Sequence, residues 1–452
     1  MSGLFSSLSM AARSLEAQRA GLDVAGQNIA NLNTPGYTRR RLSLAEVTNG
    51  TGGVEVVGTR AVRDAILDRR VRTAIPDAAR EGAILGSLSL VETTIGAPGQ
   101  GIDGRLAAFF DAFSALSVDP TSTVARNGVV LQGRDLATAF NATASSLADS
   151  ARLADRGVRD AVGQVNRLSQ QIASLNDAIA TANGIGVDAL KDQQRLAIEE
   201  LSGLTAVSVL TRTDGGVDVT IPSGRALVIG GSTYDVTLGN GPGGLATLSL
   251  GGADITSDLA SGSIGGLLHT RDTLIPGYQT SLDTLAFGVA QAVNTLHQGG
   301  FDLNGNPGAA FFTPPAGVAG AAAALAVSAP LQANSSLLAA SQTGAPGDNQ
   351  VARAIAALRD QPVLGGTTSF AEGWAALAYQ VGSDADGARA EQSSRRDVLD
   401  QVEGLRDQVS GVSLDEEAAM MLKFQRAYEA NAKYFSAVDA MLQTLMNTVG
   451  GV

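Results

Sequence analysis

The residues with the clearest chemical spacing are Asp302, Asn304 and Asn306, whose side-chain oxygens alternate as they do at the start of a calcium-binding loop. Such a loop needs glycine at its sixth position and a bidentate glutamate at its twelfth. This sequence has Pro307 and Thr313 at those positions. The spacing therefore predicts a polar turn rather than a metal site.

Two adjacent carboxylates, Glu416 and Glu417, are a second candidate, because glycoside hydrolysis uses a pair of acids. Adjacent residues on a helix diverge by about 100°, so this pair cannot flank one bond. Ser413 and Glu416 have the spacing of a capping box, and both acids favour the positive end of a helix dipole. We interpret both acids as helix-capping residues.

The remaining chemical candidates are the imidazoles and one glycine-rich run. His269 and His297 accompany no serine in a Gly-x-Ser-x-Gly turn, and the chain has no cysteine to act as nucleophile or thiolate ligand. The run 239–244 has the letters of a dinucleotide fingerprint, but Pro242 interrupts it and an alternating pattern follows, which predicts a hairpin loop. We therefore predict no catalytic residue, no cofactor or cofactor-binding residue and no metal ligand, and we do not expect an enzyme.

Composition excludes further classes of function. The 452 residues include 32 Lys and Arg against 44 Asp and Glu, and a net charge of −12 repels phosphate, which argues against a nucleic-acid partner. No apolar run approaches the length of a membrane span, and no secretory signal pattern opens the sequence. We expect no membrane insertion, and a protein that is either cytoplasmic or exported without a cleaved signal.

Apolar residues recur every seven positions at both ends of the chain, the pattern of helices that pack lengthwise on other helices. The N-terminal series stops at Thr34-Pro35-Gly36, so the first helix should end near Asn33. Because neither helix can bury its stripe alone, we expect the termini to pair and any remaining stripe to bind a neighbouring molecule. The seam residues are Leu8, Leu15, Leu22, Ile29, Leu414, Met421, Tyr428, Phe435, Leu442 and Val449.

The middle of the chain changes from a helical period to an alternating one and back. Alternation between glycine-rich turns predicts a small antiparallel β domain. The fold class is therefore mainly α with an inserted antiparallel β domain: elongated, with paired terminal coiled-coil helices and a long helical bundle. The expected units are 1–45 and 405–452 as paired terminal helices, 46–204, 262–300 and 349–404 as a helical rod-like domain, 205–261 as the β domain, and 301–348 as an irregular outer segment.

Both ends of the chain carry motifs that resemble one family. The stretch from Gly21 to Tyr37, with Gln-Asn-Ile-Ala-Asn-Leu-Asn-Thr-Pro-Gly-Tyr at its end, resembles the N-terminal signature of the bacterial flagellar axial family of rod, hook and hook-associated proteins. The stretches 413–419, 424–428 and 441–445 resemble its C-terminal signature. The stretches 267–272 and 294–305 are most similar to the hook-associated branch. The sequence after Phe312 is short and of low complexity, which indicates that an outer domain carried by some members of the family is reduced or missing in this chain.

The resemblance implies a structural protein at the junction of the flagellar hook and filament, required for filament attachment and assembly. It implies that the terminal helices line an inner tube, the helical domain forms the next layer and the β domain faces outward. The signature residues Asn28, Ala30, Asn31, Asn33, Thr34, Pro35, Gly36 and Tyr37 would fix the geometry where the first helix ends, with side-chain amides satisfying backbone groups.

The resemblance also implies the partners and the location. The partners are copies of itself in a helical junction layer, hook protein, a second junction protein, the filament, and an export chaperone on the C-terminal helix. The location is extracellular, after type III export without a cleaved signal. Two alternatives stay open: a hook or rod structural protein, and a cell-wall hydrolase on an axial scaffold, which requires a convergent acid pair within 205–345.

Overall fold

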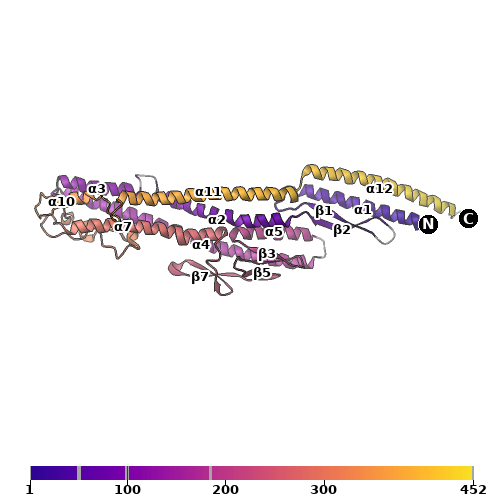
Figure 1. The fold of residues 1–452 in the computed structure, drawn as a ribbon, viewed down its shortest axis with the longest axis horizontal. Helices are drawn as coiled ribbons and strands as arrows, with labels where there is room; N and C mark the ends of the chain where they lie inside the picture. Colours follow the sequence, from indigo (N-terminus) through magenta and orange to yellow (C-terminus); the bar gives the residue numbers. More distant parts are fainter. Residues whose placement is uncertain (1, 48–51, 97–98, 100, 183–185, 450–452) are drawn as a thin grey trace.

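The computed structural model describes residues 2–47, 52–96, 99, 101–182 and 186–449. The molecule is elongated, and its first and last helices lie side by side at one end (Figure 1). These are α1 (Ser2–Ala30) and α12 (Leu414–Val449), which pack along each other. The predicted fold class, mainly helical with small antiparallel sheets and paired terminal helices, is confirmed.

A β-hairpin packs against α1 and was missed in the sequence. Its strands are β1 (Arg40–Glu46) and β2 (Val54–Ala61), which pair antiparallel. The expected boundary between 1–45 and 46–204 divides this hairpin, because charges at both ends of β1 and a register shift after Ser43 hide the strand alternation. We call α1, the hairpin and α12 the terminal unit.

The boundary expected at residue 405 also moves. α11 (Phe370–Ser410) continues through that position as one helix, starts with a capping box formed by Ser369 and Glu372, and ends before Gly411. The terminal unit therefore joins the rest of the protein through two short connections, 62–64 between β2 and α2 and 411–413 between α11 and α12, while the α1–β1 loop at 31–39 lies against the shaft.

The remaining helices form a long shaft. They are α2 (Ala65–Ile95), α3 (Ile102–Val118), α4 (Thr123–Thr181), α5 (Val187–Leu204), α6 (Gly262–His269), the π-helical turn η2 (Thr270–Leu274), α7 (Ile275–Gln298), α10 (Gln350–Ala357) and α11. With 59 residues, α4 is about 89 Å long. α11 packs along α2, and the core of the far half is built from aromatic rings on α3, α11 and residues 311–312.

The segment 301–348 closes the far end of the shaft instead of forming an outer layer. It holds α8 (Ala321–Ala324), α9 (Ala329–Ala333) and the turn η3 (Ser335–Leu337), and its Phe311 and Phe312 are fully buried. His297 ties it down: the Nε2 atom accepts the Ala339 N–H at 2.9 Å, so Nδ1 carries the proton and donates to the Ala309 carbonyl at 2.6 Å. Burial lowers the pKa of His297 to about 4, which keeps the ring neutral.

Two small sheets lie on one side of the shaft, against α4 (Figure 1). The first contains β3 (Ser208–Thr211), β4 (Val217–Thr220), β5 (Ala226–Ile229) and β6 (Ser232–Thr233); the second contains β7 (Val236–Asn240), β8 (Ala246–Leu250) and β9 (Ala253–Asp254). The glycine run at 239–244 forms the β7–β8 hairpin loop with the turn η1 (Pro242–Gly244). The Asp155 carboxylate on α4 accepts hydrogen bonds from the Ala246 N–H at 2.7 Å and from Arg271 Nη1 at 2.6 Å, which fixes β8 to the shaft.

Candidate functional site

The candidate site is the joint where the terminal unit meets the shaft, because most of the signature residues lie there. α1 ends at Ala30, three residues before the expected Asn33, and a turn leads to Gly36. Gly36 has a φ of +76°, and a Cβ atom there would lie 2.4 Å from Cδ1 of Leu196 on α5. The Gly36 carbonyl accepts a hydrogen bond from Nη2 of Arg195, which is also on α5, at 2.8 Å. This turn therefore seats the chain on α5 and needs glycine.

Asn28 connects three segments through its buried side-chain amide. Its Oδ1 atom accepts the Arg40 N–H at 3.0 Å and the Tyr37 hydroxyl at 2.8 Å. Its Nδ2 atom donates to the Arg40 carbonyl at 2.9 Å and to Glu417 Oε2 at 3.1 Å. The amide is fully used, and a carboxylate could not replace it, because two of the four bonds require a donor. Asn28 thus joins α1, β1 and α12.

Arg39 is held by the two glutamates at the start of α12. Its Nε donates to Glu417 Oε1 at 2.7 Å, and its Nη1 pairs with Glu416. The Arg39 N–H also donates to the carbonyl of Ser410, the last residue of α11, at 2.9 Å. The interpretation of Glu416 and Glu417 as capping residues alone is therefore wrong: these carboxylates also neutralise the buried Arg39 of the α1–β1 loop.

Asp192 of α5 forms a second buried ion group on the other side of the joint. Its Oδ1 atom accepts hydrogen bonds from Thr38 Oγ1 at 2.6 Å and from Arg63 Nη2 at 2.7 Å, and Arg40 Nη2 lies 3.7 Å from its Oδ2 atom. The Arg40 guanidinium also lies 5.0 Å from the centroid of the Tyr37 ring, and burial raises the pKa of Tyr37. These contacts fix the α1–β1 loop and the start of α2 against α5.

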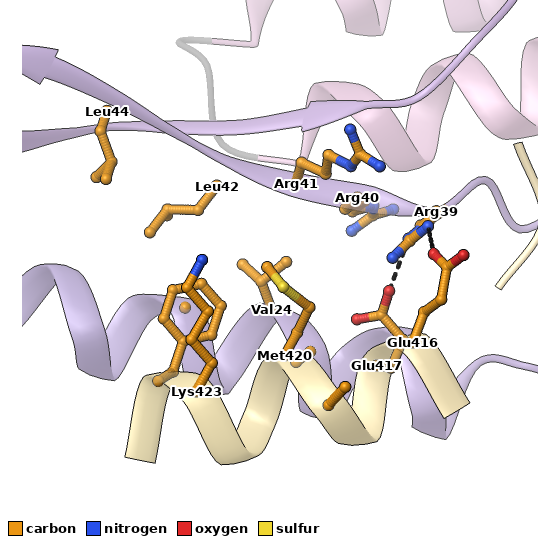
Figure 2. A pocket seen from close by; sticks show the side chains of 14 residues that line it. Val24, Arg39, Arg40, Arg41, Leu42, Leu44, Glu416, Glu417, Met420 and Lys423 are labelled. Carbon is orange, nitrogen blue, oxygen red and sulfur yellow. Dashed lines mark hydrogen bonds and ion pairs between the residues drawn. The ribbon is translucent and has the colours of Figure 1, made fainter. Parts of the chain in front are cut away.

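A groove opens between the hairpin and the two terminal helices. Figure 2 shows Leu42 and Leu44 of β1 facing Val24 of α1 and Met420 of α12. Its volume is about 600 Å³, and its other lining residues include Phe424, Arg41 and Lys423. We call this the terminal groove. Beside it the helices approach closely, because a Cβ on Gly21 would lie 2.6 Å from the Phe424 ring.

Most of the seam residues, Leu442 excepted, lie outside the row of buried residues that pairs α1 with α12. Leu8, Leu15, Leu22 and Ile29 are only half-buried, as are Met421 and Phe435. Leu414 and Tyr428 are exposed, Leu442 is buried, and the side chain of Val449 lies outside the described residues. The fully buried positions of the pair include Ala11, Ala17, Val24, Ala25, Glu417 and Val438. Most of the predicted seam is therefore left accessible in one copy.

The other signature residues lie around the turn. Asn31 Nδ2 donates to the Gln27 carbonyl at 2.9 Å, and Thr34 Oγ1 donates to Asn31 Oδ1 at 3.2 Å. Ala30, Asn33 and Pro35 are exposed. Sequence reasoning missed Asp192 entirely, because nothing in α5 marks it, whereas the run Arg39-Arg40-Arg41 was a usable signal for acidic partners.

The candidate calcium loop at 302–306 is a polar turn held by hydrogen bonds. The Asp302 carboxylate accepts the N–H groups of Asn304 and Asn306 at 2.8 Å each. Within the described ranges no group of three or more His, Cys, Asp or Glu side chains could hold a metal ion. Among the helices described, none is long and apolar enough to cross a membrane.

Charge is divided unevenly between the parts of the molecule. Residues 1–61 and 414–452 contain nine basic and nine acidic side chains, whereas 62–413 contain 23 basic and 35 acidic ones. The net charge of −12 is thus the charge of the shaft and sheets, and the terminal unit is neutral.

Three family models match successive parts of the chain. Residues 8–38 match "Flagella basal body rod protein", residues 88–312 match "Flagellar hook-associated protein FlgK helical domain", and residues 407–448 match "Flagellar basal body rod FlgEFG protein C-terminal". The two terminal matches contain the joint and the paired helices, and the central match contains most of the shaft and the sheets.

Relatives and a solved structure agree with these matches. The chain is 29% identical to flagellar hook-associated protein 1 of Bacillus subtilis, over 100% of this chain and 99% of that protein. It is 24% identical to flagellar hook-associated protein 1 of Escherichia coli, over 96% and 98%. The flagellar hook junction protein FlgK of Burkholderia pseudomallei has a similar fold, with a TM-score of 0.67 at 16% identity, covering 75% of this chain and 100% of that one.

Proposed function

Because this chain belongs to the flagellar hook-associated protein 1 family, we propose that it is a non-enzymatic structural component of the junction between the flagellar hook and filament. The observation that carries the proposal is the joint: Asn28, Arg39 and Asp192 lock the paired terminal helices onto the shaft in one geometry. A subunit of a helical lattice needs such a fixed angle, because each contact is repeated in every copy.

The seam residues are proposed to make the lattice contacts. Pairing of α1 with α12 leaves Leu8, Leu15, Leu22 and Ile29 half-buried and Tyr428 exposed. Neighbouring copies in the junction layer would bury this surface, at about 25 cal/mol per Å² of apolar area removed from water.

The remaining partners follow from the same family membership. The axial contacts would be hook protein on one side, and a second junction protein and the filament on the other. An export chaperone would bind α12 before assembly, and the protein would act outside the cell after type III export without a cleaved signal.

The test is a double variant, Leu22→Asp with Tyr428→Asp, produced in a strain that lacks the native protein. We expect normal secretion, intact hooks, and filament protein shed into the medium, because the aspartates would have to be buried without partners at the lattice contact. Leu153→Asp, an exposed leucine on α4, is the matched control and should support filaments. Normal filaments with the double variant would contradict the proposed seam.

A hook or rod structural protein is the second candidate, favoured by the two rod-family matches at the termini. Such a protein would polymerise alone, whereas a junction protein stops after a short layer. Electron microscopy of the purified protein under polymerising conditions separates the two: long tubes support the second candidate, and their absence supports the first.

A further inference from the structure

We propose that the terminal groove of one copy binds an apolar stripe on α11 of a neighbouring copy. This inference rests on the proposed function, which requires lattice contacts, and adds to it the two surfaces that meet. The stripe consists of Val398, Val402, Leu405 and Val409, and we call it the α11 stripe.

The second half of α11 has little to bury its apolar residues within one copy. Its buried side chains stop at Ala388 and resume only at Ser410. The α11 stripe residues are spaced i, i+4, i+7 and i+11, so they lie on one face of the helix. Val398, Leu405 and Val409 are 48%, 40% and 44% exposed. A continuous apolar row on an exposed helix face indicates a partner.

Charges in the terminal groove favour an acidic occupant. Arg39 is neutralised by the glutamates of α12, and Arg40 lies beside Asp192. Lys423 extends toward the groove and Arg41 extends from β1 at its edge (Figure 2), and neither has an acidic partner among the residues the structure describes. Two cations beside an apolar floor fit an apolar segment that carries a carboxylate.

The α11 stripe offers that combination. The arginines around it are paired within the chain: Arg395 with Glu391, Arg396 with Asp400, and Arg406 with Glu199. Asp397 precedes the first stripe residue and has no basic partner within the described ranges. The stripe therefore brings a net acidic group to the basic groove.

The groove and the stripe have similar lengths, and the fact that they are two different surfaces determines the symmetry of the contact. The α11 stripe spans about 16 Å, and the α12 wall of the groove from Glu416 to Phe424 spans about 12 Å. Since the groove and the stripe are different surfaces of one chain, the contact is head-to-tail. Each copy then uses its groove toward one neighbour and its stripe toward another, which builds a ring or an open helical row, depending on whether the rotation between copies closes.

The first experiment is cross-linking in the assembled junction, since the chain has no cysteine of its own. Leu42→Cys and Leu405→Cys chains are expressed together, and isolated hook-junction particles are oxidised. We expect a cross-linked dimer that forms only when both variants are present. Its yield should be at least tenfold higher than in a control that carries Val57→Cys instead of Leu42→Cys; Val57 is on the same hairpin and is 66% exposed. Incorporated chains that give no such dimer, a Leu42→Cys homodimer, or a cross-link to another protein would each overturn the inference and leave the proposed function standing.

The second experiment reverses charges and measures incorporation into particles. R41D with K423D should lower incorporation at least fivefold, and adding D397K to the same chain should restore it. Wild-type incorporation of the double variant, or failure of D397K to rescue it, would overturn the docking. A wild-type chain that never enters the particles would instead refute the proposed function.

Discussion

The glycine at the joint gives a prediction whose size can be worked out from the structure. Gly36 has a φ of +76°, and an added Cβ would meet Cδ1, Cγ and Cδ2 of Leu196 at 2.4, 2.6 and 2.7 Å. Gly36→Ala therefore combines a left-handed backbone with an overlap on α5. The backbone costs about 1 kcal/mol for an L-residue, and inserting a methyl group into filled space costs about 1–3 kcal/mol. We expect the closed joint to lose about 2–4 kcal/mol in total.

Gly186 provides the matched control. Its φ is +77°, and an added Cβ would meet nothing within 4 Å. Gly186→Ala should therefore show the backbone cost alone, about 1 kcal/mol or a fivefold change in local opening. The excess at Gly36 measures the contact with Leu196, and Leu196→Ala should relieve most of it when the two substitutions are combined.

The assay is amide hydrogen exchange of the joint, which reports local opening without requiring global unfolding. The N–H of Arg39 donates to the Ser410 carbonyl and that of Arg40 to Asn28, so both are protected only while the joint is closed. Gly36→Ala should speed their exchange about 30-fold to 900-fold. Equal effects at Gly36 and Gly186, or no relief by Leu196→Ala, would refute the steric reasoning.

Three further predictions concern buried polar contacts. Asn28→Asp places a carboxylate against the Arg40 carbonyl and Glu417, so joint stability should fall by about 2–4 kcal/mol, with exchange at 38–41 at least tenfold faster. Arg271→Ala removes the buried guanidinium that bonds both Asp155 and the Ala246 carbonyl, while Arg159 still pairs with Asp155. The loss should be about 1.5–3 kcal/mol, with exchange of 246–250 at least tenfold faster. The pKa of His297 lies below its unfolded value, so the unfolded chain binds the proton first as pH falls. Stability should drop between pH about 6.5 and 4 by up to about 3 kcal/mol; urea midpoints read from Trp374 should show it, and His297→Gln should lack this component.

The terminal helices could be predicted because a seven-residue repeat is local information. The repeat indicated that α1 and α12 pair, but not which row faces inward. In α12 the buried positions Glu417 and Val438 belong to a row three residues beyond Leu414 and Phe435. A polar residue, Glu417, interrupts that row, so hydrophobic periodicity favoured its neighbour.

The joint could be predicted only in part, because its partners are distant in sequence. The signature marked Asn28 and Gly36, yet Glu417 is 389 residues away from Asn28 and Asp192 is 154 away from Thr38. The same holds for 301–348, where low complexity suggested an outer segment. Phe311 and Phe312 pack against the α3 ring Phe109, a contact that composition does not reveal.

The division of charge has a mechanical consequence in a lattice of many copies. In the proposed lattice the neutral terminal units would pack around a common axis without net repulsion, whereas the shafts, each with a net charge of −12, would repel one another. Counterions between the shafts screen this repulsion over about 8 Å at physiological ionic strength. Removing salt would therefore increase the distance between neighbouring shafts, while the terminal units would keep their spacing. The resulting force would act on the joint, where two short chain connections are held in place by ion pairs.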